Sequence, residues 1–283
     1  MNRLSLLLLG TFMLTGTQLN AQVLTEWVET RLPQETNKIA LGYPVPIPVN
    51  TPLPFDGFRT YAGLHMRHQD LAASTPWVHP EQIGVTRQGR PILAYRLGDN
   101  DLLTIDGLPE PATLTNGGIH AREWQSPETV TGILELFALH EDDNHFYDYL
   151  RDNVNMIVIP SLNIDGFLQT QRYPSLSYMQ SDPDDPDFSP RDGRMRRKNM
   201  LSADENFNTT SDHLNGVDLN RNNSPYWGSN PGRSSPNLES IVHHGAGSAS
   251  EPETQALDYA CLLYTSPSPR DLIAHLVCRL LLG

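Results

Sequence analysis

The sequence predicts an α/β domain in which β-strands and helices alternate along the chain. Three segments carry this prediction. Residues 82–97 contain two β-rich runs on either side of a turn, residues 112–116 form a short strand-like run before a helix signal, and residues 153–160 form an apolar run of strand length. Strands that alternate with helical patterns are typical of α/β folds.

The first 21 residues have the pattern of a secretory signal peptide. Arg3 precedes an apolar stretch over residues 4–14, and the small residue Ala21 stands where cleavage is expected. A transmembrane anchor is the alternative, but glycines and threonines interrupt the apolar stretch, and a span needs about 20 apolar residues. We therefore expect cleavage near Ala21, a secreted or periplasmic protein, and no membrane anchor.

The signal peptide is followed by a proline-rich segment and then by the main domain. Five prolines between positions 44 and 54 predict an extended N-terminal arm over residues 22–57. The domain is expected over residues 58–260. Its first strands are the two runs within residues 82–97, which flank Arg87-Gln88-Gly89 and predict a hairpin.

The segment Gly117–Trp124 offers a histidine and a carboxylate three residues apart, directly after the strand predicted at residues 112–116. Its two glycines allow a tight turn, and the cap residue, proline and acid of Ser126–Glu128 then predict a helix start. His120 and Glu123 could be zinc ligands, but a catalytic zinc usually takes three protein ligands. The spacing alone also arises by chance on solvated helix faces.

Two further elements are expected later in the chain. Residues 153–160 suit a central strand that is covered on both faces, because buried parallel strands are continuously apolar. Ser250 and Glu253 have the spacing of a capping box, which predicts another helix start.

The charge balance limits the partners of this protein. The chain has 20 basic and 33 acidic residues, a net charge of −13, which argues against nucleic acid and against anionic membrane surfaces as partners. The basic run Arg194–Lys198 is by default a solvated loop, and does not change this expectation.

Five motifs together resemble the zinc carboxypeptidases of the carboxypeptidase A type, the M14 metallopeptidases. In the family's order they are Gly118–Trp124, Asn163–Phe167, Arg196–Asn199, Gly216–Asn222 and Ser250–Thr254. The resemblance implies an α/β fold with a mixed, mostly parallel sheet and helices on both faces, incomplete at the C-terminus of this chain.

The resemblance also implies the chemistry of the site. His120 and Glu123 would bind one Zn²⁺, which polarises the scissile carbonyl and acidifies bound water. Arg197 would be catalytic, because a fixed cation stabilises the developing oxyanion. Taken without the motif, Arg197 is more simply a surface arginine.

Three further residues would bind the substrate, a peptide or protein C-terminus. Asn220 and Arg221 would hold its carboxylate, since a guanidinium offers a two-pronged donor, and Arg122 would line the next subsite. Without the motif, Asn220 and Arg221 fit a turn after a strand.

Residues 261–283 are similar to a translated sequencing adapter. Cys261–Asp271 corresponds codon by codon to a transposon mosaic-end adapter, and Leu276–Leu282 to the outer part of the same adapter. We expect this tail to be non-native. The family's third zinc histidine and its general base glutamate would then be missing from this chain, and His243 and His244 come too early to be that histidine.

Two functions from different classes remain open. The first is a secreted zinc metallocarboxypeptidase, expected to be monomeric, of which the given polypeptide is an inactive fragment. The second is a non-catalytic relative that binds peptide C-termini. The presence of both His120 and Glu123 favours the enzyme.

Overall fold

A computed structural model of the chain describes residues 58–139, 145–172, 195–204, 212, 214–224 and 226–265. The predicted signal peptide, the N-terminal arm and most of the predicted adapter tail lie outside the described residues. No helix within the described ranges has the length and apolar character needed to cross a membrane. In chain order the elements are α3 (Tyr61–Ser74), β1 (Val78–Val85), β2 (Pro91–Leu97), β3 (Ala112–Asn116), α4 (Gln125–Leu139), α5 (Phe146–Arg151), β4 (Asn155–Ile159), α6 (Ile164–Arg172), the 3-10 helix η4 (Leu219–Arg221) and α7 (Pro252–Thr265).

The described strands form one mixed sheet in the order β1-β2-β4-β3. β1 and β2 pair antiparallel around the turn at Gly89, whose φ is 79°, so the predicted hairpin is confirmed. β4 pairs antiparallel with β2 and parallel with β3. One of the three described strand pairings is parallel, so the described part of the sheet is mixed, and the mostly parallel character expected of the whole domain stays a prediction.

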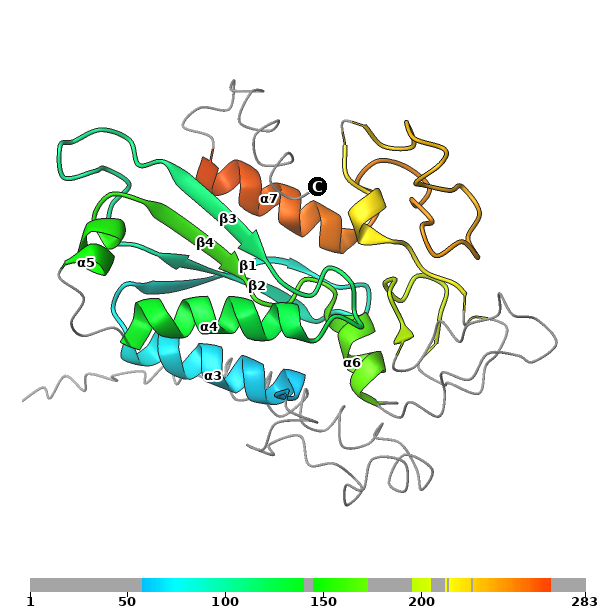
Figure 1. Ribbon diagram of the computed structural model, residues 1–283, viewed down its shortest axis with the longest axis horizontal. Helices are drawn as coiled ribbons and strands as arrows, with labels where there is room; N and C mark the ends of the chain where they lie inside the picture. The colour runs from blue at the N-terminus through cyan, green and yellow to red at the C-terminus, as the bar shows by residue number, and fades with distance from the viewer. Residues whose placement is uncertain are drawn as a thin grey trace, which may run out of the picture.

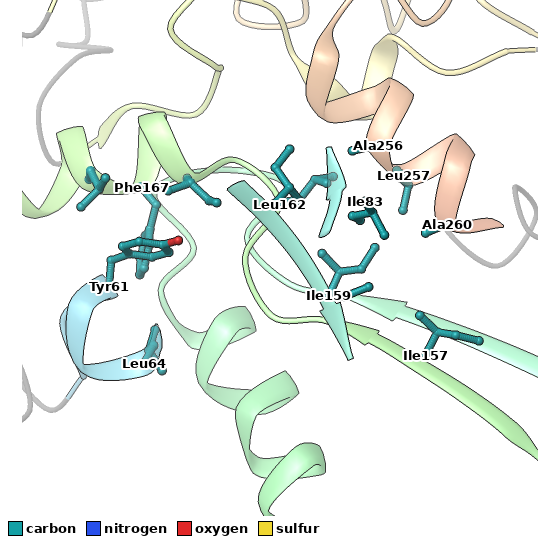
Figure 2. Packing of buried hydrophobic residues seen from close by; sticks show 14 of the residues in the cluster. Tyr61, Leu64, Ile83, Ile157, Ile159, Leu162, Phe167, Ala256, Leu257 and Ala260 are labelled. Atoms are coloured by element: carbon teal, nitrogen blue, oxygen red, sulfur yellow. The ribbon is translucent and has the colours of Figure 1, made fainter. Parts of the chain in front are cut away.

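Helices cover both faces of the sheet, as predicted (Figure 1). On one face α3 and α4 pack against β2 and β4, and Val158 joins a buried cluster with Leu134 of α4. On the other face Ile157 and Ile159 of β4 lie in a second cluster with Leu257 of α7 (Figure 2). Successive residues of β4 thus face opposite layers, which confirms that residues 155–159 form a central buried strand.

Polar contacts inside the α3–α4 layer are also satisfied. The ring nitrogen Nε2 of His68 lies 2.7 Å from the hydroxyl of Thr131, and both residues are buried. Burial, aided by neighbouring positive groups, lowers the pKa of His68 to about 3, so this histidine is a neutral core residue at physiological pH. Nearer the surface, Glu135 of α4 accepts hydrogen bonds from Arg59 and Arg67.

The turn after β3 is fixed by contacts that leave no room for a side chain. The Gly117 N–H donates to the carbonyl of Ile159 at 2.8 Å, and a Cβ added at Gly117 would stand 2.6 Å from the Pro160 oxygen. Gly118 has a φ of 65° and donates its N–H to the Ser126 hydroxyl at 2.9 Å. α4 accordingly begins at Gln125, one residue before the expected cap, and Ser126 ties the helix to the turn.

α7 begins close to the predicted position, with different residues in the capping roles. Pro252 is the first helical residue, a position where its missing N–H costs no hydrogen bond. The Ser250 hydroxyl donates to Glu251 at 2.9 Å, and the Glu253 carboxylate accepts from the side chain of Asn199. The predicted pair of Ser250 and Glu253 therefore bonds to other groups, although the helix start was correctly placed.

Candidate active site

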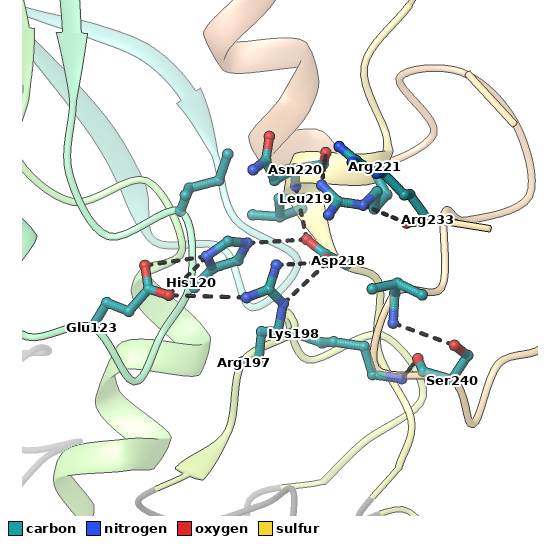
Figure 3. A network of polar contacts seen from close by, with 12 residues as sticks. His120, Glu123, Arg197, Lys198, Asp218, Leu219, Asn220, Arg221, Arg233 and Ser240 are labelled. Carbon is teal, nitrogen blue, oxygen red and sulfur yellow. Dashed lines mark hydrogen bonds and ion pairs between the residues drawn. The ribbon is translucent and has the colours of Figure 1, made fainter. Parts of the chain in front are cut away.

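The turn between β3 and α4 brings His120 and Glu123 together. Nδ1 of His120 lies 3.1 Å from each carboxylate oxygen of Glu123 (Figure 3). The His120 side chain is only 8% exposed, whereas that of Glu123 is 47% exposed. The pair thus presents an imidazole nitrogen and a carboxylate side by side at the surface of the turn.

The other ring nitrogen of His120 is held by a buried carboxylate. Nε2 lies 3.2 Å from Oδ1 of Asp218, whose side chain is fully buried. Burial alone would raise the pKa of Asp218, but the hydrogen bond with His120 and the positive charge of Arg197 outweigh it and hold the pKa below its ordinary value. A carboxylate on the second nitrogen is the usual way in which a metal-binding histidine is oriented.

His120 and Glu123 fit two positions of a zinc site. An imidazole nitrogen and a carboxylate are both zinc donors, and Nδ1 faces Glu123 because Nε2 is occupied by Asp218. In the described part of the chain, no group of three or more His, Cys, Asp or Glu side chains is placed to hold a metal ion. The donor chemistry of these two residues fits two protein ligands, and their role as zinc ligands stays a prediction.

His243 and His244 serve other contacts. Nδ1 of His243 lies 3.2 Å from the carbonyl oxygen of Ser235, and burial lowers the pKa of His243. The His244 ring packs against Trp227 with a centroid distance of 4.6 Å. These contacts describe the surroundings of the two histidines, and the expectation that neither is the third zinc ligand stays a prediction.

Arg197 lies inside the site and is not a solvated surface residue. Its Nη2 is 3.0 Å from Oδ2 of Asp218 and its Nη1 is 3.9 Å from Oε1 of Glu123, with 15% of the side chain exposed. Its carbonyl also accepts the N–H of Ala121 at 3.1 Å, which joins the Arg197 segment to the turn of His120. The guanidinium thus spans the two carboxylates of the site.

Arg196 and Lys198 of the basic run are also buried, so the default expectation of a solvated loop is wrong for these described residues. Arg196 is fully buried and donates to the carbonyls of Asn199 and Asn215. Lys198 donates to the carbonyls of Leu238 at 2.7 Å and Ser240 at 2.8 Å, and also to that of Leu214. Backbone carbonyls from neighbouring loops replace water around these cations.

The residues expected to hold the substrate carboxylate follow Asp218 directly. Oδ1 of Asp218 accepts the N–H of Asn220 at 3.0 Å and so caps η4. Arg221 donates through Nε to the carbonyl of Arg233 at 2.7 Å and through Nη1 to that of Asn220 at 2.9 Å. Arg122 lies in the turn between His120 and Glu123. The contact between His120 and Asp218 joins the turn that carries Arg122 to the segment of Asn220 and Arg221, while the binding roles of all three residues stay predictions.

Asp218 is the functional residue that sequence reasoning missed. It stands inside the motif Gly216–Asn222, two residues before Asn220, and it contacts both His120 and Arg197. Its position in a motif that already carried candidate site residues was the available signal, because a metal-binding histidine needs a partner for its second nitrogen.

Comparisons with known proteins agree with this geometry. The zinc carboxypeptidase family (peptidase M14) matches residues 65–265. Mast cell carboxypeptidase A of Rattus norvegicus is 29% identical over 216 residues, which cover 72% of this chain and 44% of that protein. An inactive metallocarboxypeptidase, ECM14, of Arthroderma otae is 30% identical over 196 residues, covering 65% of this chain and 29% of that protein.

A solved carboxypeptidase structure also resembles this chain in its fold. The crystal structure of carboxypeptidase A from Helicoverpa armigera aligns with a TM-score of 0.55 at 20% identity and covers 81% of this chain and 49% of that one. The chain spans less than half the length of the curated relatives it matches. Since the family match extends over most of the described residues, the chain belongs to the zinc carboxypeptidase family, peptidase M14.

Proposed function

We propose that this chain is part of a secreted or periplasmic zinc metallocarboxypeptidase, which hydrolyses the C-terminal peptide bond of peptides or proteins. The observation that carries the proposal is the chain of contacts from Arg197 through buried Asp218 to His120, which leaves Nδ1 facing Glu123. Export rests on the predicted signal peptide, and the protein is expected to act as a monomer.

Each residue of the site has a task in this reaction. His120 and Glu123 would hold the zinc ion, which when bound supplies Lewis-acid activation of the scissile carbonyl. Arg197, fixed by Asp218, places a preorganised cation where the oxyanion develops. Asn220 and Arg221 would hold the free C-terminal carboxylate, and Arg122 would contact the adjoining part of the peptide.

This polypeptide, without the missing C-terminal residues, is proposed to be inactive. Its described residues offer two candidate zinc ligands, His120 and Glu123, and a catalytic zinc site usually has three. The third histidine and the general base glutamate are proposed to lie in native sequence beyond residue 260 of this chain. The remaining strands that would make the sheet mostly parallel are proposed to lie there as well.

Activity on paired peptides tests the proposal. A chain completed with the native coding sequence should release the C-terminal residue of a free peptide in a zinc-dependent reaction, and should leave the C-terminally amidated peptide intact. Arg197→Ala should lower kcat/KM by about 10²–10³-fold, because one oxyanion-stabilising group is lost. The control is Arg67→Ala on α3, which removes an arginine outside the site. Equal turnover of the free and amidated peptides would refute the carboxypeptidase assignment.

One comparison favours a second candidate, a non-catalytic protein that binds peptide C-termini. A relative at 30% identity is named as inactive, so the family fold occurs in proteins without turnover. The genomic sequence beyond residue 260 separates the two candidates. A histidine after the next strand and a later glutamate would support the enzyme, whereas the absence of both, with peptide binding retained, would support the binding protein.

A further inference from the structure

Asn199 uses every hydrogen-bonding group of its side chain in the interior of the protein. Its Nδ2 donates to Oε2 of Glu251 at 2.7 Å and to Oε2 of Glu253 at 3.2 Å. Its Oδ1 accepts the N–H of Val217 at 2.8 Å and that of Leu201 at 3.2 Å. An amide has two donors and two acceptor sites, so this fully buried side chain is saturated.

These bonds join the two segments that carry the buried partners of His120. Asn199 follows Arg197 by two residues, and Val217 directly precedes Asp218. The backbone N–H of Asn199 also donates to the carbonyl of Val217 at 3.0 Å. The hydrogen bonds between Asn199 and Val217 therefore fix the position of Arg197 relative to Asp218.

The other end of the Asn199 amide is anchored at the start of α7. Glu251 is buried and also accepts from Nε of Arg87 at 2.9 Å, which balances its charge. Glu253 is fully buried, and burial, together with the charges of Asp165 and Glu251, raises its pKa to about 7. The side chains of Glu251, which directly precedes α7, and of Glu253, in its first turn, thus fix the direction of the amide.

We propose that Asn199 is a positioning residue, which holds the Arg197 and Asp218 segments in register by fastening both to the start of α7. It acts through these segments and contacts neither His120 nor Glu123 in any described hydrogen bond. This inference about Asn199 depends on the proposed peptidase function only because that function assigns a catalytic role to Arg197. A residue that merely stabilised the fold would affect all parts of the protein alike.

Hydrogen exchange of the whole chain distinguishes these two roles. The reporter is the Ala121 amide, which donates to the Arg197 carbonyl, and the reference is the amide of Ile157 in buried β4. Asn199→Ala should accelerate exchange at Ala121 by at least about tenfold relative to Ile157, because it removes four buried hydrogen bonds and even one is worth about that factor. Leu134→Ala, in the other buried cluster, is the control and should accelerate both amides equally.

A pair of substitutions that moves one charge sharpens the test. Asn199→Asp alone places a third carboxyl against Glu251 and Glu253 and should accelerate Ala121 exchange at least as much as Asn199→Ala. Adding Glu251→Gln lets the new amide at position 251 donate to the new carboxylate at position 199, and the double variant has the net charge of the native chain. Loss of one such bond changes the exchange rate by about tenfold. Its restoration should therefore return the Ala121 rate to within about threefold of the native value.

Two outcomes would overturn the proposal. One is equal acceleration of the Ala121 and Ile157 amides in Asn199→Ala, as in the Leu134→Ala control. The other is a failure of Glu251→Gln to slow Ala121 exchange in the Asn199→Asp background. Neither measurement requires zinc or a peptide, so a missing peptidase activity would refute the proposed function and leave the role of Asn199 decided separately.

Discussion

The two ends of the sheet differ in which side chains are buried, since polar side chains are buried at one end and apolar side chains are exposed at the other. At the site end, His120, Asp218 and Asn199 are buried and bonded to segments that are distant in sequence. At the other end lies the loop between β2 and β3 (Figure 1). In this loop Ile105 is 79% exposed and Leu108 is 63% exposed. This loop is held largely by local bonds, such as Thr104 N–H to the Leu108 carbonyl at 2.7 Å.

The difference shows where long-range interactions determine the structure. The site end depends on contacts between segments that meet only in the folded protein, so a small change there should affect several segments at once. The opposite loop depends on bonds between near neighbours, and loops of this kind tolerate change. Paired substitutions at the two ends test this contrast.

The largest effect is expected for glycine replacement. Gly117→Ala would place a Cβ 2.6 Å from the Pro160 oxygen and 2.9 Å from the Ser126 oxygen, both backbone atoms that cannot move independently. We expect a loss of about 3 kcal/mol or more in the free energy of unfolding, measured by urea denaturation. Gly107→Ala is the matched control, because nothing lies within 4 Å of its added Cβ and only its φ of 75° opposes the change.

The control should cost about 1 kcal/mol, the usual penalty for a left-handed residue that is not glycine. If both substitutions cost the same, the turn before His120 can relax away from Pro160, and the contrast between the two ends of the sheet is lost. A large difference would confirm that the turn is built around a position without a side chain.

The second prediction concerns pH and compares Glu253 with Glu110. Burial raises the pKa of Glu253 from its ordinary 4.5 to about 7, so the folded protein holds this proton more tightly than the unfolded chain. The contribution of Glu253 to the free energy of unfolding is therefore fully present below about pH 4.5. It is lost as the pH rises through 7, by at most about 3 kcal/mol. Glu253→Gln should remove that decline.

Urea denaturation between pH 5 and pH 8 measures this effect, at pH values that bracket the raised pKa. The pKa of Glu110, in the opposite loop, is also raised by burial and by Asp99, but the residue is only half-buried. Glu110→Gln should thus flatten the same profile much less, because solvent screens a partly exposed group. A larger effect at Glu110 than at Glu253 would contradict the contrast.

The sequence predicts the elements of this fold better than its buried polar contacts. The hairpin, the strand at residues 112–116 and the central strand at 155–159 all follow from local patterns of apolar residues and turns. His120, Glu123 and Arg197 also meet as the motifs imply. The burial of Arg196 and Lys198 does not follow from local pattern, since the carbonyls that receive them come from residues 199, 214, 215, 238 and 240.

The motif containing Asp218 was visible in the sequence, but its partner was not. Which nitrogen of His120 it contacts, and its second contact to Arg197, depend on how three separate segments pack. Spacing within one segment cannot specify such a contact, because side chains at turns have no fixed period. The same holds for Asn199, whose four bonds reach three different parts of the chain.

The smallest effect is expected for Ile105→Ser in the opposite loop. An apolar side chain that is 79% exposed buries little surface, and surface substitutions usually change stability by less than about 0.5 kcal/mol. The buried control is Ile159→Ser at the end of β4, which should cost several times more in the same urea titration. The Ile105 backbone N–H bonds to the Asn153 side chain and is unaffected by the change. A loss above about 1 kcal/mol at Ile105 would show that its side chain stabilises the folded protein after all. The loop would then resemble the site end, where buried side chains hold together segments that are distant in sequence.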